Sequence, residues 1–415
     1  MANAMKIVHV ITRLIVGGAQ ENTLLTVEGL HHRHRDDVIL ITGPAEGPEG
    51  DLFARAESQG FTVELMPELV RAIRPGTDFA AYKALRQSIR RHRPDVVHTH
   101  SSKAGIVGRQ AAWQEKVPAV VHTIHGMPFG RFEKWHKNAL YIGVERWAAR
   151  RCHAIVSVAD AMSEQALAAG VGRPEQFLTV YSGMDVDAFL NPPRPRDEVR
   201  KELGLGPSDV AFATVALLFE LKGHDDILAV APEILRQNPN VRFVFIGDGI
   251  LRDRFKADAE RLGISHAIIF TGLVPPARIP ELIGAVDAVV HPSLREGLAR
   301  VLPQSLIVGR PVISYDIDGA KEVVLPTTGH LLGPQDLEGL KKAIIDLASD
   351  PETRAKMGAE GRRRFAHQFR AETMTDELRA LYERLLSQQP VRPDGLGWRR
   401  ADWPEGTRIA PEYQG

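Results

Sequence analysis

Two charged residues in the second half of the chain stand in loops that precede predicted helices. Lys222 lies in a loop before a predicted helix, where its ammonium group can reach a diphosphate. Glu296 follows the apolar run 288–291, which is typical of a buried strand. Gly297 comes next and permits the tight turn by which such a strand passes into a helix.

The helix that follows adds further polar groups. Apolar residues recur at helical spacing over 298–306. The backbone N–H groups near Leu298 and Ala299 then form the helix N-terminus, whose partial positive charge suits a phosphate. Gln304 lies eight residues after Glu296, about 12 Å along the helix axis. This span allows one end to hold a sugar and the other a ribose, although an ordinary strand–helix unit with a polar edge has the same spacing.

Small, polar and histidine residues occur where predicted strands of the first half end. They are Gly17, Gly18, Ser101, Ser102, Lys103 and His125. Because the carboxyl ends of parallel strands meet at one edge of a sheet, we expect them to line a cleft. Gly17 and Gly18 would let the backbone approach a ligand closely, although a simple turn has the same sequence. Either serine can cap the next helix, and Lys103 in its first turn requires a nearby anion.

Four histidines near these strand ends raise the question of a metal site. They are His98, His100, His122 and His125. No cysteine or carboxylate lies beside them at the spacing of metal ligands. We therefore favour strand ends that line a cleft, and we expect no metal site.

Strands and helices alternate along both halves of the chain, which predicts parallel sheets in an α/β protein. A length of 415 residues favours two domains. The proline-rich run 192–195 marks a change in composition, and the domain boundary is expected there. The expected domains are 5–182, joined by an amphipathic helix at 371–388, and 191–369, with an irregular tail at 390–415.

Composition excludes several classes of protein. The chain has 52 basic and 52 acidic residues, and this balance argues against a general nucleic-acid binder. Cys152 is the single cysteine, so no disulfide can form within the chain. A single cysteine is consistent with a protein of the reducing cytosol. No apolar run reaches about 18 residues, so we expect no transmembrane helix. Without a signal peptide pattern, a cytoplasmic location is expected.

The predicted helix 78–93 has a basic surface. Its basic residues are Lys83, Arg86, Arg90, Arg91 and Arg93. A solvated face and a face that docks on a membrane both explain this pattern.

The motifs of the second half resemble the donor-binding signature of the family 4 retaining glycosyltransferases. They comprise Glu296-Gly297, an amide eight residues later at Gln304, then Gly309-Arg310-Pro311-Val312 and Glu322-Val323-Val324. In that family a second carboxylate holds the ribose, and Gln304 stands in its place here. The resemblance implies the GT-B fold, with two Rossmann-like domains facing a central cleft and a C-terminal helix that crosses back to the first domain.

The resemblance also implies roles for particular residues. The expected catalytic residues are Glu296, His125 and Lys222. The expected donor-binding residues are Gly17, Gly18, Lys222, Val274, Glu296, Gly297, Leu298, Ala299 and Gln304, and those on the acceptor side are Ser101, Ser102 and Lys103. The arginine that usually clamps the diphosphate is replaced by Leu217, and Arg295 or Arg300 are candidates to supply its charge.

The reaction implied is transfer of a sugar from a nucleoside diphosphate sugar, with uridine favoured, to a hydroxyl acceptor with retention. A lipid-linked acceptor at the inner membrane face is expected, as in the synthesis of surface polysaccharide or glycolipid. We expect no cofactor and no metal, since a basic clamp and helix dipoles can stabilise the leaving diphosphate. The Asp-x-Asp triplets at 185–187 and 316–318 match the metal signature of the other glycosyltransferase fold, but such triplets are common by chance.

Two alternatives remain open. A GT-B nucleotide-sugar 2-epimerase would turn over the donor without an acceptor. A catalytically impaired nucleotide-binding paralogue would explain Leu217 and Gln304. A nicotinamide dehydrogenase fits least, because the Gly-x-Gly at 247–249 lacks the third glycine of a dinucleotide-binding loop.

Overall fold

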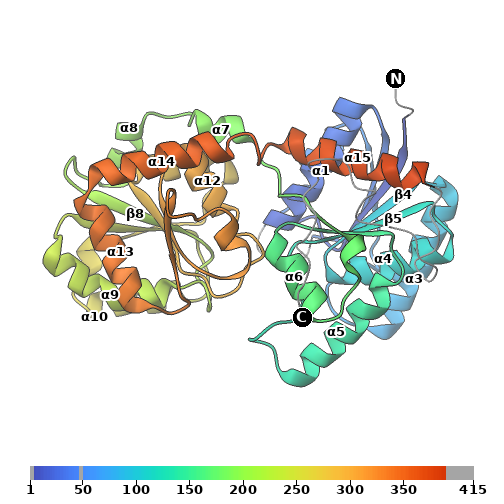
Figure 1. The fold of residues 1–415 in the computed structure, drawn as a ribbon, viewed down its shortest axis with the longest axis horizontal. Helices are drawn as coiled ribbons and strands as arrows, with labels where there is room; N and C mark the ends of the chain where they lie inside the picture. The colour runs from blue at the N-terminus through green and yellow to red at the C-terminus, as the bar shows by residue number, and fades with distance from the viewer. Residues whose placement is uncertain (1–3, 46–49, 389–415) are drawn as a thin grey trace. The chain divides into compact units, whose positions relative to one another are not determined.

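The computed structural model describes residues 4–45 and 50–388 (Figure 1). The chain divides into two compact units. The described residues up to Met184, together with 371–388, form the first unit, and Asp185–Arg370 form the second. Each unit is a parallel sheet covered by helices, which confirms the expected α/β class and the two Rossmann-like domains. The expected tail at 390–415 lies outside the described residues.

The first unit contains a seven-stranded sheet in the order β3-β2-β1-β4-β5-β6-β7. Its strands are β1 (Lys6–Ile11), β2 (Asp37–Thr42), β3 (Thr62–Leu65), β4 (Val96–His100), β5 (Ala119–Ile124), β6 (Ala154–Ser157) and β7 (Phe177–Thr179). Its helices are α1 (Gly18–His34), α2 (Phe53–Glu57), α3 (Pro75–His92), α4 (Ser102–Gln114), α5 (Trp135–Ala149), α6 (Asp160–Ala168) and α15 (Ala371–Ser387). The central strands β1, β4 and β5 are buried along almost their whole length. Their apolar runs are interrupted by His9, by the segment 98–100 and by His122 and Thr123.

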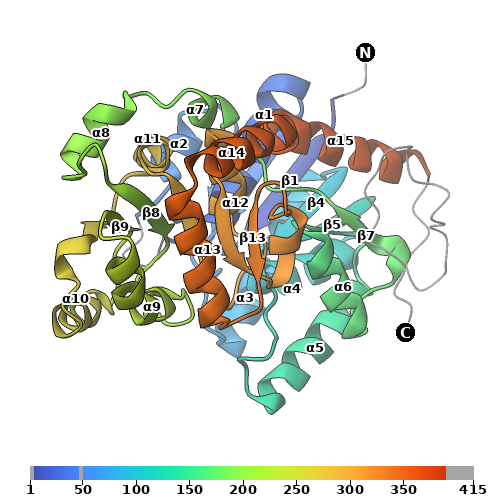
Figure 2. The ribbon, with the colours of Figure 1, turned by 60° about the vertical axis from the view of Figure 1, so that its left-hand side comes forward.

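Helix α15 completes the core of the first unit. Figures 1 and 2 both show it beside α1, although the two helices stand at opposite ends of the sequence. It contributes Met374, Leu378, Leu381, Tyr382 and Leu385 to the core that the strands form. At the contact with α1, a Cβ built on Gly29 would lie 2.5 Å from Oγ1 of Thr375, so only glycine permits this close approach.

The second unit contains a six-stranded sheet in the order β10-β9-β8-β11-β12-β13. Its strands are β8 (Val210–Val215), β9 (Val241–Ile246), β10 (Ile268–Gly272), β11 (Ala288–His291), β12 (Val312–Tyr315) and β13 (Gly329–Leu332). Its helices are α7 (Val186–Leu190), α8 (Arg196–Glu202), α9 (His224–Gln237), α10 (Arg252–Arg261), α11 (Ile279–Ala285), α12 (Val301–Val308), α13 (Leu337–Ser349) and α14 (Pro351–Phe365).

The strand order reverses once in each sheet, between β1 and β4 and between β8 and β11. At such a switch point the loops that leave neighbouring strands diverge, and a crevice forms outside the carboxyl ends of the strands. The residues that follow β1, β4, β8 and β11 are therefore the ones positioned to hold a ligand.

Two local expectations were wrong. Helix α12 begins at Val301, later than the apolar spacing predicted, because Leu298 and Ala299 are buried in an irregular turn. Neither Ser101 nor Ser102 caps α4 with its side chain. Among the described residues, no helix has the length and apolar character needed to cross a bilayer.

Candidate functional site

The loop after β8 is shaped so that Lys222 meets the loop after β11. Leu221 and Gly223 both have left-handed backbone, with φ of 66° and 79°, and turn the chain sharply on either side of Lys222. A Cβ on Gly223 would lie 2.1 Å from the carbonyl oxygen of Pro292, so glycine is required there. The N–H of Leu294 donates to the carbonyl of Leu221 over 2.8 Å. The two loops that flank the switch point are thereby fastened together.

Lys222 and Glu296 form an ion pair at this junction. Nζ of Lys222 lies 2.5 Å from Oε1 of Glu296, and both side chains are partly buried. The same carboxylate oxygen accepts a hydrogen bond from the Ser293 hydroxyl at 2.8 Å and lies 3.2 Å from Nε2 of His291. The N–H of Glu296 donates to Oδ2 of Asp318 at 2.9 Å. Glu296 is thus held from several directions.

These contacts decide the charge of Glu296. Burial would raise its pKa, but the hydrogen bond with His291 and the positive charge of Lys222 outweigh burial and lower the pKa to about 2. The carboxylate is therefore ionised at neutral pH and can only accept hydrogen bonds. It is suited to holding hydroxyl groups rather than to donating a proton.

Free backbone groups lie beside this ion pair. Among the residues described, the N–H groups of Leu298 and Ala299 have no hydrogen-bond acceptor, although both residues are nearly buried. The carbonyl of Gly297 accepts from the N–H of Gly319 at 2.9 Å and fixes the turn. Gln304 follows on α12 and is half-buried. The predicted donor groups Lys222, Glu296 and 297–299 thus come together in the second unit.

Val274 lies apart from this group, after the edge strand β10. It is half-buried, and the preceding turn at Gly272 has a left-handed φ of 72°. The N–H of Gly247 donates to the carbonyl of Gly272 at 3.2 Å and links this turn to the loop after β9. Exposed apolar side chains stand in the loops after β8, β9 and β10. Sequence reasoning missed Phe219, Ile250 and Leu273, and the exposed Leu217 lies near Phe219 in the loop after β8.

Three residues around Glu296 were also missed. His291 and Ser293 stand within five residues of Glu296, and polar residues directly after a buried strand were a usable signal. Asp318 belongs to the Asp-x-Asp triplet 316–318, and the structure uses it as a hydrogen-bond acceptor for the backbone of Glu296. The arginines proposed to replace the missing clamp lie close by in the chain. Arg295 is exposed, and Arg300 is the residue before α12.

In the first unit, Ser101 lies at a strained turn after β4. Its φ of 62° is rare for a residue other than glycine, and such strain gathers at functional sites. The hydroxyls of Ser101 and Thr12 lie 2.8 Å apart, and the N–H of Ala104 donates to Oγ1 of Thr12 at 3.1 Å. Thr12, from the loop after β1, therefore caps α4 in place of the serines. The anion expected near Lys103 is Asp78, at 2.5 Å.

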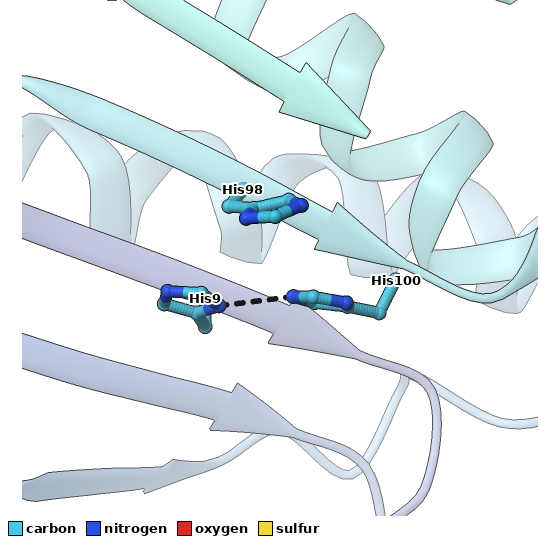
Figure 3. Close-up of side chains that lie close together, drawn as sticks. All are labelled: His9, His98 and His100. Atoms are coloured by element: carbon cyan, nitrogen blue, oxygen red, sulfur yellow. Dashed lines mark hydrogen bonds between the residues drawn. The ribbon is translucent and has the colours of Figure 1, made fainter. Parts of the chain in front are cut away.

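A chain of histidines leads from the buried sheet to His125. Figure 3 shows its members His9, His98 and His100. Nδ1 of His9 lies 2.9 Å from Nε2 of His100, and Nδ1 of His100 lies 3.1 Å from Nε2 of His125. His9 and His98 are neighbours in the sheet register, and both His9 and His98 stack on the ring of His100. Burial lowers the pKa of His9 to about 3 and holds the pKa of His98 and His100 well below its usual value. These imidazoles are neutral.

Three of these rings have nitrogens close enough to raise the question of a metal ion. Nitrogens of His9, His98 and His100 lie within 4.8 Å of one another. However, His98 is already bonded, with its Nδ1 to the hydroxyl of Tyr382 at 2.5 Å and its Nε2 to that of Thr123 at 2.6 Å. The rings of His9 and His98 lie at 15° and 29° to that of His100, and at 41° to each other. These contacts describe a hydrogen-bonded stack of rings, and the expectation of no metal site stays a prediction.

Two pockets adjoin these residues in the first unit. One of about 240 Å³ surrounds His125 and Gly126, and a larger one of about 600 Å³ contains Lys103. Ser101 and Ser102 line both. Gly17 is the residue before α1 and Gly18 is exposed, while the nearby Gln20 lines the larger pocket. The expected acceptor-side residues therefore share one hollow surface.

The comparisons with known proteins divide the chain as the fold does. The family model described as Glycosyltransferase Family 4 matches residues 16–188, and the one described as Glycosyl transferases group 1 matches 195–364. The chain belongs to the family 4 glycosyltransferases.

Relatives of this family 4 glycosyltransferase carry similar names. It is 26% identical over 382 residues to an Escherichia coli enzyme, UDP-Gal:alpha-D-GlcNAc-diphosphoundecaprenol alpha-1,3-galactosyltransferase, covering 91% of this chain and 96% of that one. It is 31% identical over 229 residues to a D-inositol 3-phosphate glycosyltransferase of Segniliparus rotundus, and the match covers 53% of this chain and 49% of that one.

Solved structures confirm the GT-B fold of the family 4 glycosyltransferase. Anabaena HepE, solved in complex with UDP-glucose, matches with a TM-score of 0.76 and 20% identity over 91% of this chain and 99% of that one. WaaG, a glycosyltransferase involved in lipopolysaccharide biosynthesis, matches with a TM-score of 0.68 and 18% identity over 91% of this chain and 99% of that one.

Proposed function

We propose that this glycosyltransferase moves a hexose from a UDP-sugar to a hydroxyl of a lipid-linked acceptor, with retention at the anomeric carbon. The observation that carries the proposal is the pair of Lys222 and Glu296, which sets a cation beside an ionised carboxylate at a switch point. The name of the Escherichia coli relative and the UDP complexes of HepE support the choice of donor and acceptor.

The donor would bind by exchange of partners at this pair. A diphosphate draws the ammonium group of Lys222 and the free N–H groups of Leu298 and Ala299, since all three are positive. Glu296 remains fixed and ionised through its other partners, so it accepts hydrogen bonds from hydroxyls of the sugar. Gln304 can both accept from and donate to the ribose diol.

Transfer breaks the bond between the anomeric carbon and the diphosphate oxygen, and the electron pair leaves with UDP. The acceptor hydroxyl forms the new bond on the same face of the sugar, and its proton passes to the departing phosphate. Stabilising the charge on this leaving group is the main task of the protein, and one well-placed donor contributes about 3 kcal/mol. His125 would border the reacting face.

The acceptor side is supported by the larger pocket of the first unit. Ser101, Ser102 and Lys103 offer hydroxyl and ammonium groups, whereas Ile106 and Val144 give it apolar walls. This mixture suits a molecule with a charged head and a lipid chain. We further propose that the enzyme acts in the cytoplasm at the inner membrane face, in the synthesis of surface polysaccharide or glycolipid.

A thermal-shift panel of nucleoside diphosphates and their sugars tests the donor. We expect UDP and one UDP-sugar to raise the unfolding temperature of the full chain above the values with GDP or ADP, because binding to the folded state stabilises it. Equal shifts for all nucleotides, or none, would contradict the proposal. An NMR spectrum of the product then shows whether the anomeric configuration of the donor is retained.

Two further experiments separate the alternatives. A 2-epimerase would convert its UDP-sugar without an acceptor, and an impaired paralogue, favoured by Leu217 and Gln304, would bind UDP without transfer or hydrolysis. We expect transfer that requires the acceptor and that persists in excess EDTA, because no metal is needed in the proposed mechanism. Loss of transfer in EDTA, with recovery on addition of a divalent cation, would contradict it.

A further inference from the structure

The smaller pocket of the first unit combines apolar walls with polar side chains. Its volume is about 240 Å³, and it contains His125, which the proposed reaction places beside the reacting face of the donor sugar. Phe129 and Val171 are among its apolar residues. Thr123 and Glu145 also line it, and the proposed mechanism gives neither of them a role. Both are nearly buried, so their polar atoms need hydrogen-bond partners.

Glu145 of α5 is held in place by an arginine of the neighbouring helix α4. Its Oε2 accepts from Nη2 of Arg109 at 2.7 Å, and Nε of Arg109 donates to the carbonyl of Gly105 at 2.8 Å. Burying such an ion pair costs solvation free energy, and an apolar pair of similar size often stabilises a protein as well. Among the described residues, Oε1 of Glu145 has no hydrogen-bond donor. The ion pair therefore presents one carboxylate oxygen in a fixed position.

A buried relay from α15 determines the orientation of the Thr123 hydroxyl. The hydroxyl of Tyr382 lies 2.5 Å from Nδ1 of His98, and Nε2 of His98 lies 2.6 Å from Oγ1 of Thr123. Burial raises the pKa of Tyr382 well above its usual value, so this hydroxyl keeps its proton. His98 is its one partner among the described residues. Tyr382 therefore donates to Nδ1 of His98, because a buried O–H without an acceptor would be costly.

The direction of the second bond in the relay follows from the first. His98 is neutral, because burial lowers its pKa, and a neutral imidazole carries a single N–H. With Nδ1 accepting from Tyr382, this N–H is on Nε2 and donates to Oγ1 of Thr123. The Thr123 hydroxyl still has its own proton to donate, and no other described residue accepts it. The proton is thus available to an oxygen atom in the smaller pocket.

The smaller pocket therefore offers a carboxylate that accepts hydrogen bonds and a hydroxyl that donates one. Neighbouring oxygens that donate and accept in turn are typical of a sugar ring, whose carbon face suits the apolar walls. An anion is poorly suited to this pocket, because the carboxylate of Glu145 would repel it. Basic side chains line the larger pocket instead, and they are Arg13, Arg71 and Lys103. Glu145 lines both pockets and so stands where they adjoin.

We propose that the smaller pocket is a subsite for a sugar of the acceptor, in which Glu145 accepts from a hydroxyl of the ring and Thr123 donates to one of its oxygens. The charged linkage of that sugar lies in the larger pocket, beside the basic side chains. The acceptor is therefore a glycosyl phosphate or diphosphate ester rather than a lipid phosphate without a sugar. This inference rests on the proposed function, since it names the acceptor class for the same site.

Calorimetry with the full chain tests the subsite. The probes are decyl diphosphate and its glycosyl esters with glucose, galactose or N-acetylglucosamine. We expect at least one glycosyl ester to bind about tenfold more tightly than decyl diphosphate, because it adds two hydrogen bonds, one of them to a charged group. Equal affinities for decyl diphosphate and for all three esters would overturn the proposal.

Substitution of Glu145 should remove this preference. In Glu145→Gln, the amide oxygen is drawn to Arg109, so an NH₂ donor takes the place of the free carboxylate oxygen in the pocket. The glycosyl ester that binds most tightly should lose about tenfold in affinity, whereas the affinity for decyl diphosphate should not change. Glu57→Gln, at an exposed residue of α2, is the matched control. A preference for the glycosyl ester that persists in Glu145→Gln would overturn the proposal.

The role of Thr123 is tested with and without substitution. Thr123→Ser keeps the hydroxyl and should keep the preference for the glycosyl ester, while Thr123→Val should weaken binding of that ester several-fold. Equal binding by the two variants would overturn the role of Thr123 in the pocket. In the unsubstituted protein, nitrogen-15 NMR should place the proton of His98 on Nε2. A proton on Nδ1 would mean that Thr123 donates to His98, and would likewise overturn this role.

Two measurements separate failure of this inference from failure of the proposed function. The UDP-induced thermal shift of Glu145→Gln should equal that of the wild type, because Lys222 and Glu296 belong to the other unit. A wild type that prefers a glycosyl ester but does not bind UDP would contradict the proposed function alone. Transfer to decyl phosphoglycerol, whose hydroxyls belong to no sugar, at the rate reached with the glycosyl esters would overturn this inference and leave the proposed function standing.

Discussion

Lys222 has two tasks in the proposed reaction, and one substitution should reveal both. Lys222→Met removes the charge that binds the diphosphate, so kcat/KM should fall about 100-fold, as for the loss of one stabilising donor. It also removes one of the two groups, His291 being the other, that lower the pKa of Glu296 to about 2. With the contribution of Lys222 lost, the acid limb of the pH–rate profile should move to higher pH, while His291 and Ser293 keep Glu296 ionised at neutral pH.

The matched control for this change is Lys201→Met, because Lys201 is an exposed lysine on α8 of the same unit. A profile measured from pH 4 to 8 should be unaltered in the control. An unchanged rate in Lys222→Met would remove Lys222 from the mechanism.

The histidine chain should fix which nitrogen of His125 bears its proton. Nε2 of His9 is buried and has no partner among the described residues, and an orphaned N–H there is disfavoured. We expect the protons on Nδ1 of His9 and of His100, so that Nε2 of His125 accepts. His100→Phe should therefore lower kcat several-fold with little change in the affinity for UDP, and should alter the tautomer of His125.

Nitrogen-15 NMR of the imidazoles reports that tautomer directly. His32→Phe, at an exposed residue of α1, is the control and should leave the spectrum of His125 unchanged. Loss of activity in His100→Phe without a change of tautomer would indicate a packing role alone.

Residues that carry chemistry were predictable from the sequence when their partners are near in the chain or when a family motif includes them. Glu296 and Gly297 follow a strand in a recognisable run. Thr12 was not predictable as the cap of α4, because it acts across 92 residues. The bond between His9 and His100 spans 91 residues and is formed only when β1 and β4 become neighbours.

At the scale of elements, the contact of α1 with α15 depends on one glycine. Gly29→Ala should destabilise the protein by about 1–3 kcal/mol, since the new methyl group would overlap Thr375, whose branched side chain cannot easily move. Gly143→Ala is the matched control on α5, where a Cβ meets nothing within 4 Å. It should stabilise the protein by up to about 1 kcal/mol.

Urea denaturation of both variants measures this difference. Equal effects of the two substitutions would show that α15 adapts to a methyl group at position 29, and that its close approach to α1 is not rigid.

Elements themselves were largely predictable, because short apolar strands and periodic helices alternate through both units. The start of α12 was not, since Leu298 and Ala299 continue the apolar spacing of the helix although they belong to a turn. The exposure of Trp135 and Trp147 on α5 was not predictable either, since aromatic residues on a helix are usually buried. Spacing along a helix does not distinguish a side chain that meets a neighbouring element from one that meets solvent.

At the scale of the whole molecule, the buried histidines predict a local sensitivity to acid. Among the described residues, five histidines of the first unit have a pKa below its usual value, compared with two of the second. Those of the first unit are His9, His98, His100, His122 and His153, and those of the second are His224 and His330. Their contribution to stability is complete above the unfolded pKa of about 6.5 and is lost as pH falls toward the folded values.

The size of this effect is considerable. At pH 5 a fully buried histidine that stays neutral in the folded unit, such as His9, costs about 2 kcal/mol relative to neutral pH, because the unfolded chain takes up a proton that the folded unit excludes. Hydrogen exchange of the full chain at pH 7.5 and 5.5, corrected for intrinsic rates, should show greater loss of protection in the first unit. Equal loss in both units would contradict this prediction. Glu296 should not contribute to this loss of protection, since its carboxylate takes up a proton only below pH 4.5.

The division into two α/β units was predictable from the alternation of strands and helices and from the proline-rich run. The pockets were not, because each is lined by side chains from several loops that come together only in the folded sheet.

The first unit is interrupted in the sequence, and this order matters while the protein is being made. A ribosome that has passed Met184 must synthesise the whole second unit before the segment from Ala371 emerges. At elongation rates of about 5–20 residues per second, that interval lasts roughly 10 to 40 seconds. During this interval the nascent chain lacks Met374, Leu378 and Tyr382 of α15. The apolar surface of the first unit that α15 covers therefore stays accessible to chaperones.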